Sequence, residues 1–226
     1  MKALVLFSGG LDSTVCLGLA VKKYGPGEVL ALSIFYGQKH IKEMKASEKI
    51  AGYYGVKRIT INLGEIFKDS NCTLLEGNAD IPHEEYADQL KKTDGSPVNT
   101  YVPYRNGLFL SSAASIALSH GCSEIYYGAH ADDAAGNAYP DTTTAFNNAI
   151  SEAIFIGSGD ALRVVAPFID KTKAQVVAMG VGIGVPFKLT WSCYEGHEYA
   201  CGLCGTCRDR INAFKANGLE DPIRYE

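Results

Sequence analysis

The sequence predicts an α/β fold built on a doubly wound parallel sheet of five strands, followed by a C-terminal metal-binding element. Short apolar runs alternate with segments of helical periodicity along residues 1–186. A glycine turn, residues 8–14, separates the first apolar run from the first helical segment. Four cysteines then gather between residues 193 and 207. Alternating strands and helices require crossover connections, which indicate a parallel sheet covered on both faces.

Length and composition limit the classes of function. The chain has 226 residues, is 46% hydrophobic and carries a net charge of −4, so a sizeable core is expected and no basic surplus favours a nucleic-acid partner. No apolar run approaches ~20 residues, so no membrane span is expected. Residues 1–2 lead directly into the first strand, which predicts no signal peptide and a cytoplasmic location. The seven cysteines should then be reduced unless a metal holds them.

The first strand, residues 2–7, runs into a turn that can bind phosphate. Adjacent glycines allow positive φ and close approach of the backbone, and free N–H groups at the start of the helix over 14–21 suit an anion. A carboxylate here, Asp12, repels phosphates unless a cation lies between them, which indicates Mg²⁺ shared with a nucleotide. The alternative is an ordinary strand-to-helix turn in which Asp12 or Ser13 caps the helix.

This turn resembles the pyrophosphate loop, S-G-G-x-D-S, of the ATP pyrophosphatase superfamily, and it lacks the Walker A spacing. The resemblance implies cleavage of ATP to AMP and pyrophosphate and a Rossmann-like, adenine nucleotide alpha hydrolase-like fold. The residues expected to bind ATP are Leu6, Phe7, Ser8, Gly9, Gly10, Leu11, Asp12, Ser13, Thr14 and Gly128.

The remaining elements follow in order. Further strands are expected over 28–36, 57–63, 123–130 and 162–168, and further helices over 40–54, 107–119, 142–156, 172–181 and 206–217. Residues 64–100 lose this rhythm, and we expect an irregular insertion near the active site, with a plain surface loop as the alternative. These elements divide the chain into an ATP-binding domain, 1–186, and a C-terminal element, 187–226.

Charged residues near the expected ends of strands are the next candidates. Arg105 and Asn106 open the helix after residue 104, where they would reach a phosphate or ribose, and a surface ion pair is the alternative for Arg105. A lysine at a helix N-terminus opposes the helix dipole, so Lys173 is expected to clamp a phosphate. The segment from His130 to Asp133 carries one histidine and two aspartates, which we treat as supporting candidates only.

Tyr139 and Asp141 are candidates for binding a flat heterocycle. The tyrosine ring would stack on it, and the carboxylate would accept two hydrogen bonds from an edge such as that of guanine. The alternative is a turn in which Asp141 caps the following helix.

The C-terminal cysteines have the spacing of a metal site. Three of them form C-x2-C-x2-C, and a fourth precedes them by eight positions; the set is Cys193, Cys201, Cys204 and Cys207. Four thiolates suit a closed, structural zinc site, and the same spacing also occurs in iron–sulfur proteins. Cys16, Cys72 and Cys122 lie apart and are expected in the core or in loops.

The motifs together resemble one family, the 7-cyano-7-deazaguanine synthases of the QueC type. The segments that carry the resemblance are 8–14, 103–106, 136–141, Lys173 and 190–207. One departure is that Thr142 and Thr143 stand where many members have Cys and Arg. The family resemblance implies a zinc-binding homodimer that uses ATP, Mg²⁺ and ammonia to convert 7-carboxy-7-deazaguanine to the nitrile.

In that scheme Asp12, Lys173 and Arg105 are catalytic, while Asn106, Tyr139 and Asp141 bind the deazaguanine. One alternative is a tRNA thiolation enzyme of the same superfamily, which should show a basic RNA-binding domain and a reactive cysteine pair. Another alternative, of a different class, is a nucleotide sensor without catalytic activity. Pyrophosphate release distinguishes the sensor, and an iron–sulfur spectrum would favour the thiolation enzyme.

Overall fold

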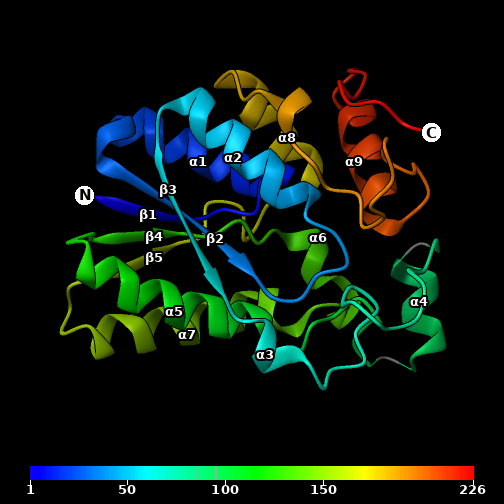
Figure 1. Cartoon of the computed structure of the whole chain (residues 1–226), viewed down its shortest axis with the longest axis horizontal. Coiled ribbons are helices and arrows are strands. Elements are labelled where there is room, and N and C mark those ends of the chain that lie inside the picture. The colour runs from blue at the N-terminus through cyan, green and yellow to red at the C-terminus, as the bar shows by residue number, and fades with distance from the viewer. Residues whose placement is uncertain (85, 95) are drawn as a thin grey trace.

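A five-stranded, fully parallel sheet forms the centre of the computed structural model, which describes residues 1–84, 86–94 and 96–226 (Figure 1). The strand order is β3-β2-β1-β4-β5, so the chain winds outward in both directions from β1. The strands are β1 (Ala3–Leu6), β2 (Val29–Phe35), β3 (Lys57–Asn62), β4 (Glu124–Tyr126) and β5 (Arg163–Val165). The predicted doubly wound α/β fold is therefore confirmed.

Helices cover both faces of the sheet. In Figure 1, α1 (Leu11–Tyr24), α2 (Lys42–Tyr54) and α8 (Lys173–Gly182) lie on one side, and α5 (Arg105–Ser119) and α7 (Thr144–Gly157) lie on the other. Helix α9 (Gly205–Ala216) packs against α8. The short helices are α3 (Gly64–Phe67), α4 (Tyr86–Lys92) and α6 (Ala131–Ala134), with 3-10 turns at Pro26–Glu28, Ala135–Asn137, Pro140–Thr142 and Phe187–Leu189.

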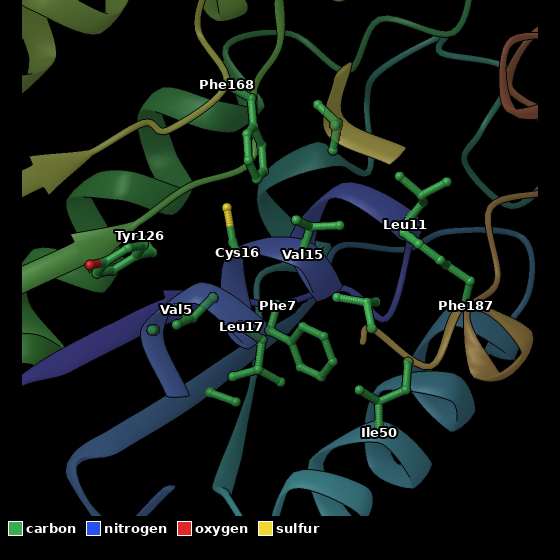
Figure 2. Packing of buried hydrophobic residues seen from close by; sticks show 14 of the residues in the cluster. Val5, Phe7, Leu11, Val15, Cys16, Leu17, Ile50, Tyr126, Phe168 and Phe187 are labelled. Carbon is green, nitrogen blue, oxygen red and sulfur yellow. The ribbon is translucent and has the colours of Figure 1, made fainter. Parts of the chain in front are cut away.

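The period-2 alternation of the central strand divides the core into two layers. Val5 and Phe7 face α1 and α8, whereas Leu4 joins the core under α5 and α7. Figure 2 shows Phe7, Val15 and Leu17 packed together, with Ile50 of α2 and Phe187 closing the same layer. Burial on both faces explains why the first two strands are continuous apolar runs rather than alternating ones.

Capping residues set several helix starts. Helix α7 begins at residue 144 rather than 142 because the Thr143 side chain accepts a hydrogen bond from Phe146 N. Helix α8 begins with a capping box between Thr172 and Gln175. The strand expected over 123–130 is shorter, because pairing ends at Tyr126 and the chain leaves the sheet there.

Residues 64–100, expected as an irregular insertion, contain α3 and α4. Leu75 of this stretch forms an antiparallel bridge with Gln38, which follows β2. Positions 85 and 95 of that stretch lie outside the described residues. The C-terminal helix α9 joins the main core through Ala213 and Phe214. None of the helices in the described part of the chain combines the length and apolarity needed to cross a bilayer.

Candidate active site

A cavity of about 250 Å³ lies at the carboxyl end of the sheet, between the two helical layers. Parallel α/β sheets bind ligands at this edge. The predicted catalytic, ATP-binding and substrate-binding residues that line the cavity are Leu6, Phe7, Ser8, Gly10, Leu11, Asp12, Ser13, Gly128, Arg105, Asn106, Tyr139 and Lys173. The predicted metal ligand Cys193 lines it too. Gly9, Thr14 and Asp141 do not line it, and each has a structural contact described below.

The loop after β1 presents an uncapped helix start to this cavity. Gly10 is the N-cap of α1 and no side chain caps it, so the N–H groups of the first turn stay available to an anion. Gly9 has φ +91°, and a Cβ there would lie 2.5 Å from Glu43 O and Ser47 N of α2, so only glycine fits. Thr14 is buried and donates to Gly10 O at 2.6 Å.

Gly128 is required by packing rather than by an open contact with a ligand. A Cβ at this position would approach the backbone of Asp12 and Ser13 at 3.3 Å. The glycine therefore lets the end of β4 lie directly against the first turn of α1, while its own backbone lines the cavity.

An ion pair joins the first turns of α1 and α8. Lys173 Nζ donates to Asp12 Oδ2 at 2.5 Å and lies 3.2 Å from His130 Nε2. His130 is buried, with Nε2 at 3.4 Å from Asp133 Oδ1 and 3.9 Å from Asp12 Oδ1. Lys173 was expected to bind a phosphate, and without a ligand its anionic partner is Asp12.

Charge and burial act in opposite directions on this pair. Burial opposes the charge of Asp12, but Lys173 and His130 outweigh it, and the pKa of Asp12 is lowered. Burial likewise opposes the charge of Lys173, but Asp12 and Asp133 raise its pKa. Both groups are therefore ionised at neutral pH. Among the described residues, Asp12 Oδ1 has no hydrogen-bond partner.

Helices α6 and α9 add carboxylates around Lys173. Asp132 Oδ2 accepts from Lys173 N at 2.7 Å, which places an anion at the N-terminus of α8. Asp209 of α9 lines the cavity, and burial raises its pKa to about 6. Asp209 could not be predicted from the sequence, because only the packing of α9 on α8 brings it to this edge.

A guanidinium occupies the opposite wall of the cavity. Arg105 donates to the Tyr36 hydroxyl at 3.2 Å, and its Cζ lies 5.1 Å from the Tyr36 ring centroid and 5.9 Å from that of Phe109. Burial opposes its charge, but Tyr36 and Asp141 raise its pKa. No carboxylate of the described chain pairs with it within 4.0 Å. It is therefore a cation available to an anionic ligand.

Glu43 in the first turn of α2 also lines the cavity and was not a candidate from the sequence. Burial raises its pKa to about 7, Arg105 lowers it and Asp12 raises it. The helical periodicity of residues 40–54 predicts which residues form the apolar face of this helix, and it gives no information about its charged residues. Glu43 lies eight residues beyond the end of β2, so only the packing of α2 brings it to the edge of the sheet where ligands bind.

Asn106, Tyr139 and Asp141 come together at the start of α5. Asp141 is 2% exposed, and its Oδ2 accepts from Asn106 N at 2.8 Å. Burial raises its pKa. It thus caps α5 rather than α7, whose N-cap is Thr143. The Tyr139 hydroxyl bonds the Thr100 hydroxyl at 2.6 Å, and both Asn106 and Tyr139 line the cavity.

The four C-terminal cysteines converge. Their Sγ atoms all lie within 4.8 Å of one another, and all four side chains are buried. Backbone N–H groups point at the sulfur atoms: Cys201 N lies 3.4 Å from Cys193 Sγ, and Cys204 N lies 3.3 Å from Cys201 Sγ. Four thiolates within this distance could hold a tetrahedral metal ion, with no position left for a substrate. The predicted four-cysteine cluster is therefore present.

Comparison with known proteins identifies the family. The model described as "Queuosine biosynthesis protein QueC" matches residues 2–218. A 7-cyano-7-deazaguanine synthase from Archaeoglobus fulgidus is 39% identical over 224 residues, which span 99% of this chain and 90% of that protein. One from Thermoplasma acidophilum is 41% identical over 231 residues, which span 100% of this chain and 92% of that protein.

The solved structure of an NMN synthetase from Francisella tularensis has a TM-score of 0.51 at 17% identity, covering 97% of this chain and 78% of that one. This likeness supports the fold alone. The family model and the full-length relatives agree with the resemblance carried by the phosphate loop and the cysteine cluster. The chain therefore belongs to the QueC family.

Proposed function

We propose that this protein is a 7-cyano-7-deazaguanine synthase, which converts 7-carboxy-7-deazaguanine and ammonia to the nitrile and cleaves ATP to AMP and pyrophosphate. Its relatives carry that name over nearly the full chain. The observation that carries the proposal is the uncapped start of α1, which shares one cavity with the Asp12–Lys173 pair and with Arg105.

The chemistry explains why ATP is needed. A carboxylate is a poor electrophile because oxide and hydroxide are poor leaving groups. Attack of the carboxylate on the α-phosphorus of ATP expels pyrophosphate and leaves AMP on the acyl oxygen. Ammonia then displaces AMP to give the amide, and a second adenylation on the amide oxygen, followed by loss of AMP, gives the nitrile. These steps depend on positioning and on charge neutralisation.

The phosphate end of the cavity comprises the loop and Lys173. The residues proposed to contact ATP are those of 6–14 together with Gly128. Asp12 Oδ1, which has no hydrogen-bond partner among the described residues, fits a ligand for Mg²⁺, since this ion takes one or two carboxylates plus phosphate oxygens. Mg²⁺ would neutralise phosphate charge there, and Lys173 would stabilise the charge that develops on the α-phosphate.

The substrate end comprises the start of α5 and its neighbours. Arg105 would bind an anionic group of ATP or of the substrate, because it lies in the wall with no carboxylate partner among the described residues. Tyr139 and Asn106 would contact the deazaguanine. Asp141 would position Asn106 rather than contact the ligand, since its Oδ2 accepts a hydrogen bond from Asn106 N at 2.8 Å.

The cysteine cluster would hold one structural zinc. The sulfur atoms fit this ion because they are buried, mutually close and approached by backbone N–H donors. The proposal further includes a cytoplasmic location and no nucleic-acid partner, as composition predicts, and a homodimer acting on small molecules, as the family resemblance implies.

The test is product analysis. Purified protein receives ATP, Mg²⁺, ammonium and 7-carboxy-7-deazaguanine, and mass spectrometry follows the deazapurine while chromatography follows the nucleotide. The expected products are the nitrile, AMP and pyrophosphate. Release of ADP would contradict adenylation, and nucleotide binding without turnover would leave a sensor as the function.

A further inference from the structure

Four carboxylates line the cavity, and two of them, Glu43 and Asp209, have no hydrogen-bond or ion-pair partner among the described residues; Asp209 lies on the Lys173 side of the cavity, and Glu43 does not. Asp12 is paired with Lys173 at 2.5 Å, and Asp133 lies 3.4 Å from His130. Glu43 lines the same cavity and is partly buried, yet it makes no hydrogen bond or ion pair with any described residue. A partly buried carboxylate without a hydrogen bond lowers the stability of the free protein, and a ligand that bonds to it would remove this cost.

The backbone contacts place this carboxylate at the reacting end of the cavity. Glu43 lies in the first turn of α2, which packs directly on the phosphate loop, since a Cβ at Gly9 would lie 2.5 Å from Glu43 O. A Cβ at Gly10 would lie 3.5 Å from Glu43 Oε1. The carboxylate therefore faces the loop proposed to hold the phosphates of ATP, beside which the adenylated carbon must lie.

The proposed reaction releases protons from nitrogen at that place. Ammonia bound to an acyl carbon must lose a proton to become an amide, and the nitrile forms only when the two remaining N–H protons are removed. We propose that Glu43 is the catalytic base that accepts these protons, an inference that rests on the function proposed above.

The two steps balance as follows. In the first, the nitrogen lone pair forms the C–N bond, the C–O bond to AMP breaks with its electrons on oxygen, and one N–H proton moves to the Glu43 carboxylate. Glu43 then returns this proton to water. In the second, the adenylated amide first loses one N–H proton to water and becomes a neutral imidate. Its remaining N–H proton then moves to Glu43, the electron pair of that bond becomes a C–N bonding pair, and AMP leaves with the C–O electrons. Glu43 again returns its proton to water.

The residues around Glu43 bring its pKa close to the value that suits a catalytic base. Burial raises the pKa of Glu43 to about 7; Arg105 of α5 lowers it and Asp12 of α1 raises it. Burial, and to a lesser extent Glu43, raises the pKa of Tyr36, which follows β2. A base is most effective when its pKa lies near the working pH, because it is then both available and strong enough to accept a proton.

The experiment separates adenylation from nitrogen chemistry in Glu43→Gln, which keeps the size of the side chain. Without ammonia, the exchange of pyrophosphate into ATP that requires 7-carboxy-7-deazaguanine should stay near the wild-type rate. Single-turnover formation of the amide, and conversion of supplied amide to nitrile, should each fall about 100-fold or more. At a fixed concentration of free NH3, the wild-type rate of amide formation should rise with pH through about 7, and the variant should lack this step.

Glu48→Gln, an exposed change on the same helix, is the matched control and should behave as wild type in all three assays. Glu43→Asp, with a shorter base, should recover part of the rate. Equal losses in exchange and in amide formation would overturn the inference and place Glu43 in ATP binding, and unchanged amide formation would overturn it too. If the wild-type protein forms no nitrile, the proposed function fails instead.

Discussion

At the scale of single residues, the pair between Asp12 and Lys173 links stability to activity. Asp12→Asn keeps the shape of the side chain but removes its charge. Pyrophosphate release with the acid substrate should fall about 100-fold or more, because preorganised charge at the phosphate is lost. The unfolding free energy should fall by about 1–3 kcal/mol, since Lys173, only 8% exposed, keeps its charge without its partner. Denaturant titration and a pyrophosphate assay measure the two effects.

A double variant distinguishes these effects. Asp12→Asn with Lys173→Met removes the uncompensated cation, so stability should recover while activity stays low. Asp170→Asn, an exposed change near the start of α8, should alter neither quantity. Near wild-type pyrophosphate release in Asp12→Asn would contradict the role proposed for this carboxylate.

The place of residues 8–14 at the cavity could be predicted because the signal is local. The turn, its glycines and the uncapped helix follow one another within seven positions, so the sequence alone indicates an anion site. Glu43 and Asp209 could not be predicted, because nothing in their neighbouring residues distinguishes them from solvated carboxylates. Their role as cavity residues depends on how α2 and α9 pack against the sheet and α8.

At the scale of elements, the start of α8 depends on one cap. The Thr172 hydroxyl accepts from Gln175 N at 3.3 Å, and Gln175 Oε1 accepts from Thr172 N at 2.9 Å. Thr172→Ala should therefore lower the unfolding free energy by about 1 kcal/mol. Urea titration measures the change, and Thr144→Ala, exposed at the first position of α7, is the control. An unchanged midpoint for Thr172→Ala would show that α8 is fixed by packing alone.

The same cap explains why element boundaries were predicted unevenly. The helix expected over 172–181 begins at Lys173 with Thr172 as its N-cap, so the start of α8 was predicted within one residue. Asp141 and Thr143 both fit the sequence pattern for the start of α7, and only the structure shows that Asp141 turns instead to α5. A carboxylate near two helix starts in space cannot be assigned from its neighbours in sequence.

At the scale of the whole molecule, buried carboxyls make stability depend on pH. The pKa of Glu43 rises from 4.5 to about 7 on folding, so the folded state holds more protons than the unfolded state between those values. This group makes its whole contribution to the unfolding free energy below pH 4.5, and the contribution is lost as the pH rises through about 7. Glu43→Gln should thus gain stability relative to wild type between pH 5 and pH 8. Denaturant titrations at both values measure it, and an identical difference at the two would contradict the raised pKa.

The C-terminal segment connects the cysteine cluster to the active site. Trp191 N donates to Gly9 O of the phosphate loop at 3.0 Å, and α9, which follows Cys204, supplies Asp209 to the cavity. The buried Arg210 bonds Asp221 at 2.6 Å and Thr190 Oγ1 at 2.6 Å, which holds this segment together around the cysteines. Loss of the metal should therefore loosen the active site as well as the tail.

Cys204→Ser tests this connection. The variant should lose the zinc proposed to be held by the four cysteines, unfold with several kcal/mol less free energy, and bind ATP more weakly because the loop contact at Trp191 is no longer fixed. Metal analysis, thermal unfolding and nucleotide titration measure these effects, and a strong zinc chelator should reproduce them in wild-type protein. Cys122→Ser, in the core layer under α5 and α7, removes a buried thiol far from the cluster in sequence and should leave the zinc content unchanged. Full zinc content and unchanged ATP affinity in Cys204→Ser would mean that neither the metal nor the active site depends on this sulfur.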